Sequence, residues 1–293
     1  MRILLSGSTG LLGSAFHREL RKDPELQIVT TTRSDLDSKE FYKVRKIFEL
    51  HKPEVFINCS AYTDVDRAES NQQECWSVNS DSLSFFAEAA EEFNSHIIHF
   101  STDYIFDGLA TAPYLETSTP NPINFYGESK LQGESNLISR LGSSATVIRT
   151  AWLYGGNKKT FVDHLVDQIT RGVKEIKVVD DQVGQLTNVD LLTAAVLNMI
   201  SRGIDNYDGI WNITSQDFAS WYEIALLISD YFGIQNQLVG INSDSLNRVA
   251  KRPKFSALNA SKFESIFYKL PTWREDLEHY LKEGFEVGRN REI

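Results

Sequence analysis

The sequence predicts an α/β protein built on a doubly wound parallel sheet, followed by a smaller mixed α/β domain. Short apolar runs alternate with stretches of helix length over the first 150 residues, and this alternation is typical of βα units in a parallel sheet. A glycine-rich turn, Gly7-x-x-Gly10-x-x-Gly13, lies between the first apolar run and the first helix. Beyond about residue 210 the pattern becomes mixed, which favours a second, smaller domain.

Length and composition narrow the class of protein. The chain has 293 residues and a formal net charge of −10, and this length allows a sizeable core without disulfide bonds. The two cysteines, Cys59 and Cys75, lack metal-ligand spacing, so we expect them to be reduced. No apolar run approaches the ~18 residues of a membrane span. We therefore expect a soluble, cytoplasmic protein that binds neither nucleic acid nor membrane.

The elements of the first domain follow from the apolar runs in chain order. Strands are expected at 1–6, 26–32, 54–60, 96–101 and 145–150. Helices are expected from the glycine turn to about residue 22, at 39–51, at 73–93 and from about residue 126. Because consecutive strands are separated by about one helix length, this order predicts a Rossmann-type sheet.

The glycine-rich turn predicts a dinucleotide site. Glycines at this spacing between a strand and a helix let the backbone approach a pyrophosphate, which lies on the free N–H groups of the helix start. For an isolated glycine triplet, a tight turn without a ligand is the alternative. The cofactor-binding residues predicted from this turn are Gly7, Thr9, Gly10, Leu11, Leu12 and Gly13.

The end of the second strand favours NADPH over NADH. An NAD-specific site usually has a carboxylate there, whereas an Arg accommodates the 2′-phosphate of NADP. This chain has Arg33 at that point, although an exposed Arg can also be a simple surface residue, so NADH stays possible. Asp37 is either the cap of the next helix or a cofactor ligand. Ala61 and Tyr62 follow the third strand, where ligands gather in such sheets, and complete the cofactor set.

An acid/base pair is predicted within residues 101–130. Tyr126 and Lys130 lie at positions i and i+4, so they share one face of a helix. An adjacent cation stabilises a phenolate and lowers the pKa of the phenol, so such a pair can deliver a proton. The hydroxyl of Thr102, at the end of the preceding strand, could bond the same substrate oxygen. Together these residues predict a carbonyl-reduction site.

Spacing alone does not identify this pair, because the chain holds three Tyr-x-x-x-Lys matches. Tyr42 and Lys46 lie on an amphipathic stretch, and Tyr154 begins Tyr-Gly-Gly-Asn, which is typical of a turn that leads to Lys158. Only Tyr126 opens a helix after an apolar strand that ends in Ser-Thr. We therefore assign the proton donor to Tyr126.

The second half of the chain predicts the smaller domain. Helices are expected at 160–171, 190–202 and 220–232, and strands at 175–179 and 210–214. The predicted division is an NADP(H)-binding domain at 1–150, to which a helix at about 187–203 returns, and a substrate-binding domain at 151–186 and 204–293. The run Lys251-Arg-Pro-Lys-Phe-Ser256 either grips a diphosphate or is a solvated loop.

Taken together, these segments resemble the extended short-chain dehydrogenase/reductases and, within them, the dTDP-4-dehydrorhamnose reductase family with its RmlD-like substrate-binding domain. The resemblance covers nearly the whole chain. It rests on the joint occurrence, in order, of Gly7-x-x-Gly10-x-x-Gly13, Ala61-Tyr-Thr-Asp-Val-Asp-Arg-Ala-Glu69, Ser101-Thr-Asp-Tyr-Ile-Phe-Asp-Gly108, Tyr126-Gly-Glu-Ser-Lys-Leu-x-Gly-Glu134, Arg149-Thr-Ala-Trp-Leu-Tyr-Gly155, Asp181-Gln-Val-Gly184, Ser220-Trp-Tyr-Glu-Ile-Ala225 and Arg252-Pro-Lys-Phe-Ser256.

The resemblance implies which residues act. Thr102, Tyr126 and Lys130 would be catalytic, and the last two would also contact the cofactor. The substrate-binding residues would be Val65, Asp103, Tyr104, Trp152, Gln182 and Arg252, with the guanidinium near the diphosphate.

Two positions depart from the family pattern. Leu186-Thr187 replaces the usual Pro-Thr, which bears on a turn at the edge of the substrate pocket. Ala15 replaces a Glu through which some members join two subunits by a metal ion. No metal site is therefore predicted, and a monomer or a homodimer is expected.

The implied activity is the NADPH-dependent reduction of the C4 ketone of a nucleotide-linked 4-keto-6-deoxyhexose, as in the conversion of dTDP-4-dehydrorhamnose to dTDP-L-rhamnose. One alternative is a nucleotide-sugar epimerase or dehydratase that retains NAD. Dehydratases resembling this fold place Asp-Glu after the Thr, whereas here Asp103 is followed by Tyr104. The other is a non-catalytic NADP-binding regulatory subunit resembling the methionine adenosyltransferase β subunit, against which Tyr104, Trp152 and Arg252 argue.

Overall fold

The computed structural model describes residues 1–32, 35–36, 38–234 and 237–286. A six-stranded parallel sheet in the order β10-β5-β4-β3-β1-β2 forms its larger part. The strands are β1 Arg2–Ser6, β2 Gln27–Thr31, β3 Val55–Asn58, β4 His96–Thr102, β5 Ala145–Thr150 and β10 Gly209–Asn212. The expected doubly wound parallel sheet is thus confirmed.

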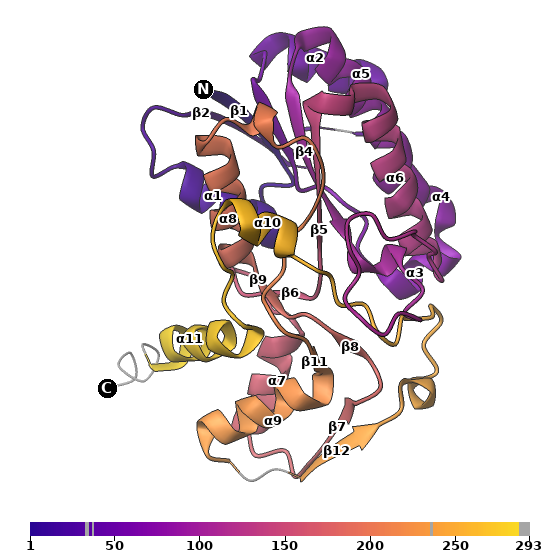
Figure 1. Ribbon diagram of the computed structural model, residues 1–293, viewed down its shortest axis with the longest axis vertical. Helices are drawn as coiled ribbons and strands as arrows, with labels where there is room; N and C mark the ends of the chain where they lie inside the picture. Colours follow the sequence, from indigo (N-terminus) through magenta and orange to yellow (C-terminus); the bar gives the residue numbers. More distant parts are fainter. Residues whose placement is uncertain (33–34, 37, 235–236, 287–293) are drawn as a thin grey trace.

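Helices cover both faces of this sheet, as Figure 1 shows. On one face pack α1 Leu11–Leu20, α8 Val189–Ser201 and α10 Ser261–Ile266. On the other pack α2 Phe41–His51, α5 Ser82–Phe93 and α6 Phe125–Leu141. Successive side chains of β1 point to opposite faces of the sheet, as the period of two in a strand requires. Ile3 and Leu5 pack in the core with α1 and α8, whereas Leu4 packs in the core with α2 and α5.

The expected helix at 73–93 is interrupted. The chain forms α3 Val65–Ser70, α4 Gln72–Trp76, a π-helical turn at Ser77–Asp81 and then α5. Gly133 of α6 faces this wider turn so closely that a Cβ on it would lie 2.2 Å from the carbonyl oxygen of Asn79. The π-helical turn directs the Asn79 amide inward, where it accepts from Tyr62 N (2.9 Å) and donates to Tyr62 O (3.1 Å).

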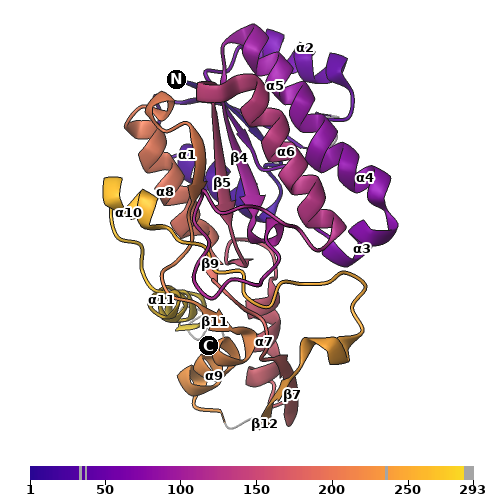
Figure 2. The same cartoon turned by 45° about the vertical axis from the view of Figure 1, so that its right-hand side comes forward.

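The smaller part lies below the sheet in Figures 1 and 2. Its core is formed by α7 Phe161–Thr170, α9 Trp221–Phe232 and α11 Trp273–Glu286. They pack with a parallel pair, β7 Glu175–Val179 and β12 Gln237–Ile241. Two short pairs complete it: β6 Leu153–Tyr154 with β9 Thr187–Asn188, and β8 Val183–Gly184 with β11 Ala219–Ser220. Short 3-10 turns lie at Asp103–Ile105, Gly142–Ser144, Ile204–Asn206 and Ser243–Leu246.

Part of the segment 204–293, which the sequence assigns to the smaller domain, packs with the large sheet. β10 pairs with β5, so that Ile210 lies opposite Val147. Trp211, Phe263 and Leu270 belong to the same core as α1 and α8. The division of the chain into domains stays a prediction, but β10 and α10 are elements of the larger part. Among the described residues, no helix combines the length and apolar character that crossing a bilayer requires.

Replacing Gly133 by alanine should destabilise the fold, because the added methyl group meets backbone at Asn79 that cannot move without disturbing the π-helical turn. Overpacking of this kind costs about 1–3 kcal/mol. Urea denaturation should therefore show a lower midpoint for Gly133→Ala. Gly284→Ala is the matched control, because Gly284 also lies in a helix and its Cβ would meet nothing within 4 Å. Equal midpoints for the two variants would contradict the close contact.

Candidate active site

The glycine turn lies where β1 ends at the carboxyl edge of the sheet. Gly7 has a φ of +65°, which favours glycine. A Cβ on Gly13 would lie 2.1 Å from Gly7 O, so α1 starts directly under the turn. No side chain caps the N-terminus of α1, and its first turn holds no acidic residue. The free N–H groups of this helix fit the pyrophosphate of a dinucleotide.

A cavity of about 330 Å³ opens beside this turn. Of the predicted cofactor residues, it is lined by Gly7, Thr9, Gly10, Ala61 and Tyr62. Leu11, Leu12 and Gly13 lie in the first turn of α1 and are not part of its wall. Arg33 and Asp37 lie outside the residues that the structure describes. The structure thus brings the glycine turn and the segment after β3 together around one cavity.

Sequence reasoning missed the cations at this cavity. Lys39 and Lys158 both line it, together with Glu74. Lys39 pairs with Glu74 at 3.1 Å. Lys158 arrives on a loop that begins at Gly155 and Gly156, whose φ angles are +87° and +71°. The neighbouring Asn157 accepts a hydrogen bond from Ser14 Oγ of α1 at 2.8 Å, which ties this loop to the cofactor helix.

The signal for that loop was Tyr-Gly-Gly-Asn, which indicated a turn after Tyr154. Tyr154 itself is buried in β6, where its hydroxyl donates to Asp276 Oδ2 at 3.0 Å. Tyr42 is 72% exposed on α2. Neither tyrosine therefore lies at the carboxyl edge of β4 with Thr102.

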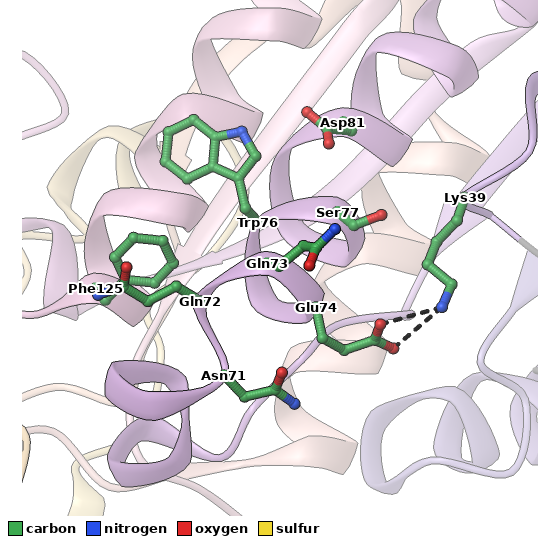
Figure 3. A pocket seen from close by; sticks show the side chains of 9 residues that line it. All are labelled: Lys39, Asn71, Gln72, Gln73, Glu74, Trp76, Ser77, Asp81 and Phe125. Atoms are coloured by element: carbon green, nitrogen blue, oxygen red, sulfur yellow. Dashed lines mark hydrogen bonds and ion pairs between the residues drawn. The ribbon is translucent and has the colours of Figure 1, made fainter.

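A second hollow, of about 550 Å³, lies on the outer side of α4 and the π-helical turn. Figure 3 shows Trp76 and Phe125 at one end of it and the Lys39–Glu74 ion pair at the other. None of the predicted catalytic or substrate-binding residues lines it. The hollow is therefore separate from the predicted catalytic and substrate-binding residues.

Tyr126 and Lys130 stand on the first turns of α6, which is held firmly at its start. Asn124 caps the helix by accepting from Gly127 N at 2.8 Å, and Glu69 Oε1 accepts from Phe125 N at 2.9 Å. A Cβ on Gly127 would lie 2.1 Å from Tyr104 O, so the helix start approaches the turn after β4 closely. The Tyr104 and Tyr126 rings meet edge to face, with centroids 6.1 Å apart.

The hydroxyl of Thr102 is part of a hydrogen-bonded group at the end of β4. It donates to Asp103 Oδ1 at 3.0 Å and accepts from Tyr104 N at 3.2 Å. Ser256 Oγ donates to the other carboxylate oxygen of Asp103 at 2.5 Å. Burial raises the pKa of Asp103 to about 6, while the hydrogen bonds from Ser256 and Thr102 oppose this rise.

Tyr126 is the predicted proton donor, and its phenol lies in surroundings that disfavour the phenolate. Burial raises its pKa above the ordinary value, and a hydrogen bond with Thr102 opposes this rise. The expected lowering of this pKa by Lys130 is not found, because Lys130 is not among the groups that shift the pKa of the phenol. The Lys130 Nζ instead donates to Phe100 O at 2.6 Å and lies 3.1 Å from His99 Nε2. Burial lowers the pKa of Lys130 to about 8.

The predicted substrate-binding residues Val65 and Arg252 lie together at the start of α3. Val65 opens α3, and the next residue, Asp66, pairs with Arg252 at 2.6 Å. This bidentate pair holds the pKa of Asp66 down, to about 2. The run around Pro253 is therefore not simply a solvated loop, since Arg252 is tied to α3 and Ser256 to the end of β4.

Trp152 and Ser256 both lie next to Gly184 of β8. The backbone φ of Trp152 is +43°, and its ring stacks on Trp221 with centroids 3.8 Å apart. A Cβ on Gly184 would lie 2.7 Å from the Trp152 ring, so the neighbouring strand must have glycine there. Gln182 is buried just before Val183, which exchanges backbone hydrogen bonds with residues 254 and 256.

The two departures from the family pattern lie in packed parts of the structure, Leu186 between β8 and β9 and Ala15 in α1. Leu186 is buried in the core of the smaller part, and Thr187 pairs with Leu153 in β9. Ala15 is buried in the core beneath α1. Among the residues that the structure describes, no group of three or more His, Cys, Asp or Glu side chains could hold a metal ion.

Comparison with known proteins identifies the family. A model described as "RmlD substrate binding domain" matches residues 1–285. The dTDP-4-dehydrorhamnose reductase of Sinorhizobium fredii is 32% identical over 94% of this chain and 95% of its own length. That of Escherichia coli K12 is 31% identical over 97% of this chain and 98% of its own length.

Solved structures agree with this result. A dTDP-4-dehydrorhamnose reductase of Clostridium acetobutylicum superimposes with a TM-score of 0.89 at 33% identity, covering 96% of this chain and 99% of that one. The reductase of Bacillus anthracis, in complex with NADP, gives a TM-score of 0.90 at 29% identity, with the same coverage of both chains. The chain belongs to the RmlD substrate-binding domain family, together with the dTDP-4-dehydrorhamnose reductases.

Proposed function

We propose that this protein reduces the C4 ketone of dTDP-4-dehydrorhamnose to give dTDP-L-rhamnose, with NADPH as the preferred reductant and NADH as a possible one. The observation that carries the proposal is that the cavity beside the glycine turn and the hydroxyl of Thr102, with the Tyr126 phenol beside it, lie at the carboxyl ends of neighbouring strands of one sheet. The residues that build this edge lie in a chain that matches named reductases over nearly its whole length.

Bound NADPH supplies the hydride. Tyr126 delivers its proton to the oxygen that develops negative charge at C4, because burial keeps the phenol protonated at neutral pH. Thr102 orients the same oxygen through its hydroxyl. Lys130, one helical turn from Tyr126, holds the nicotinamide ribose.

Substrate binding is assigned to the group around Ser256. We propose that Val65, Asp103, Tyr104, Trp152 and Gln182 contact the sugar nucleotide and that Arg252 binds its diphosphate. The Arg252 guanidinium has spare N–H donors beyond those that Asp66 uses, so it can bind both anions. Loss of one of these side chains should raise the KM for the sugar nucleotide while leaving that for NADPH unchanged.

Tyr104 also separates reduction from dehydration. Dehydration at C5 and C6 needs its own acid and base, and Tyr104 occupies the position of the second acid. Its hydroxyl is buried, and burial raises its pKa above the ordinary value. We expect the protein to act in the cytoplasm as a monomer or homodimer, which size-exclusion chromatography tests, and to have no nucleic-acid or membrane partner.

The proposed activity predicts oxidation of NADPH by the purified protein when dTDP-linked 4-keto-6-deoxy sugars are added, measured as loss of absorbance. UDP-linked substrates in parallel assays show whether the base matters. A net reduction must release oxidised cofactor, so the protein should lose any bound cofactor on dialysis. Stoichiometric NAD that survives dialysis would instead support an epimerase, and NADP binding without turnover would support a regulatory subunit.

Tyr126→Phe should lower kcat by about 10²–10⁴, because it deletes the proton donor and keeps the ring. Cofactor affinity, measured by fluorescence titration with NADPH, should change little. Tyr42→Phe is the surface control and should match the unaltered protein. Tyr154→Phe removes the hydrogen bond to Asp276, so it should lower stability more than kcat. Full activity of Tyr126→Phe would overturn the assignment.

Substitution of Arg33 and of Lys158 should affect cofactor binding in different ways. Arg33→Ala is expected to raise the KM for NADPH and leave that for NADH nearly unchanged, because the substitution removes a contact to the 2′-phosphate, a group that NADH lacks. Lys158→Ala should raise both, because Lys158 lines the same cavity as the glycine turn that holds the pyrophosphate.

The matched control is the next residue. Lys159 is 63% exposed and pairs with Asp167 at 2.5 Å, away from the cavity lining. Lys159→Ala should leave both KM values unchanged. Equal effects of the two lysine variants would show that the loop, rather than the Lys158 charge, matters to the cofactor.

A further inference from the structure

A chain of buried polar side chains crosses the sheet beneath the active site. Ser6 at the end of β1 pairs with Asn58 at the end of β3, and Asn58 pairs with His99 in the middle of β4. Ser6 Oγ bonds Asn58 Oδ1 at 2.7 Å, and Asn58 Nδ2 bonds His99 Nδ1 at 3.1 Å. His99 Nε2 then lies 3.1 Å from Lys130 Nζ. All are at most 2% exposed, so water does not compete for these bonds.

The direction of each bond in this chain is fixed by one backbone group. Ser60 N–H can only donate, and it donates to Asn58 Oδ1 at 3.1 Å. That oxygen is therefore the acceptor of the amide, and Nδ2 is the donor that faces His99. Nδ1 of His99 must accept, so it carries no proton. His99 is then the neutral tautomer with its proton on Nε2.

That proton points at Lys130. An ammonium has three donors and no acceptor, so it cannot accept the Nε2–H of His99. A neutral amine can, because it has one lone pair. In that form Lys130 donates one N–H to Phe100 O at 2.6 Å and accepts from His99 at 3.1 Å. Both contacts are then satisfied hydrogen bonds.

We propose that His99 is a positioning residue for Lys130: it presents a fixed Nε2–H to the amine and thereby favours the unprotonated form of Lys130 in its place against β4. When Lys130 gains a proton, its Nζ must leave His99 and turn along α6 toward Tyr126. The lysine thus has two positions, one for each protonation state. This inference rests on the proposed function only for its effect on catalysis.

The surroundings of Lys130 support this proposal. The nearest carboxylate on its own helix, Glu134, favours the protonated form of Lys130, but burial outweighs this effect and Glu134 is itself paired with Arg149 at 2.7 Å. The other ionisable groups that interact with Lys130 are the thiols of Cys59 and Cys75 and His99 itself, and Tyr126 lies one helical turn earlier on α6. Burial raises the pKa of both thiols, so both stay neutral. Burial also lowers the pKa of Lys130 to about 8.

A lysine that exists in both forms near neutral pH can return a proton to Tyr126 after each turnover. A lysine held permanently as an ammonium by a carboxylate cannot. The alternative is that His99 only satisfies the Asn58 amide in the core and has no influence on Lys130. The two possibilities differ in the tautomer of His99 and in the titration of Lys130, both of which are measurable without turnover.

The first test is the ¹⁵N NMR spectrum of the histidine rings in the full, unaltered chain. The His99 signal, assigned by its loss in His99→Gln, should show the neutral Nε2–H tautomer from about pH 6 to about pH 9. The exposed His164 and His279 provide reference signals for rings in contact with water. A protonated Nδ1 on His99, at any pH in this range, would overturn the proposal.

The second test compares His99→Gln with His99→Leu. Glutamine keeps a carbonyl for Asn58 and an N–H for Lys130, whereas leucine has neither. Loss of a hydrogen bond to the neutral amine favours the ammonium, so His99→Leu should raise the Lys130 pKa and strengthen its proton affinity about 3- to 10-fold. His99→Gln should stay close to the unaltered protein. The Lys130 side-chain signal, assigned by its loss in Lys130→Met, reports this titration directly.

The same shift should appear in kinetics. The decrease of kcat at high pH that accompanies deprotonation of Lys130 should move to higher pH in His99→Leu and stay in place in His99→Gln. The KM for NADPH should change less than kcat. If His99→Leu leaves the Lys130 titration unchanged, His99 has no influence on Lys130 and the proposal is wrong. If the NMR results hold while no substrate is reduced, the positioning by His99 stands and the proposed function fails.

Discussion

The position of α6 against the sheet is the constraint on which the rest of the site depends. Arg149 of β5 and Glu134 of α6 form a buried pair at 2.7 Å, and Arg149 also donates to Glu116 O at 3.1 Å. Burying two charges is costly, and a pair of this kind is favourable only when its donors and acceptors are satisfied. This pair therefore tolerates little displacement of the helix. Tyr126 and Lys130 lie on the same helix, so their positions are fixed by the same pair.

Close packing then links the catalytic helix to the cofactor cavity. Gly133 lets α6 touch the π-helical turn, and the same turn aims Asn79 at the backbone of Tyr62, which lines the cavity. Asn79 also donates to Ser129 Oγ of α6 at 3.0 Å. A single amide thus holds the cavity wall and the helix together. π-helical turns occur frequently at functional sites, and this one lies between α6 and the cavity beside the glycine turn.

The proposed substrate side of the site is built by long-range contacts between the two parts of the molecule. Residues 254 and 256 exchange backbone bonds with Val183, and this brings the Ser256 hydroxyl onto Asp103 beside Thr102. Arg252 of the same segment reaches α3 through Asp66. A displacement of residues 252–256 would therefore change both the predicted diphosphate site and the surroundings of the Thr102 hydroxyl.

The sequence alone was enough to predict the parallel strands of the first 150 residues and most of the helices between them, the glycine turn and the place of Tyr126 at the start of a helix. Each of these depends on residues within a few positions of one another, where periodicity and turn chemistry act. Only the tertiary structure decided that the predicted single helix at 73–93 contains a π-helical turn, that Lys158 reaches the cofactor cavity and that β10 joins the large sheet. It also decided where the Lys130 amine lies, because its partner His99 is 31 residues away in the chain and only strand pairing and burial bring the two side chains together.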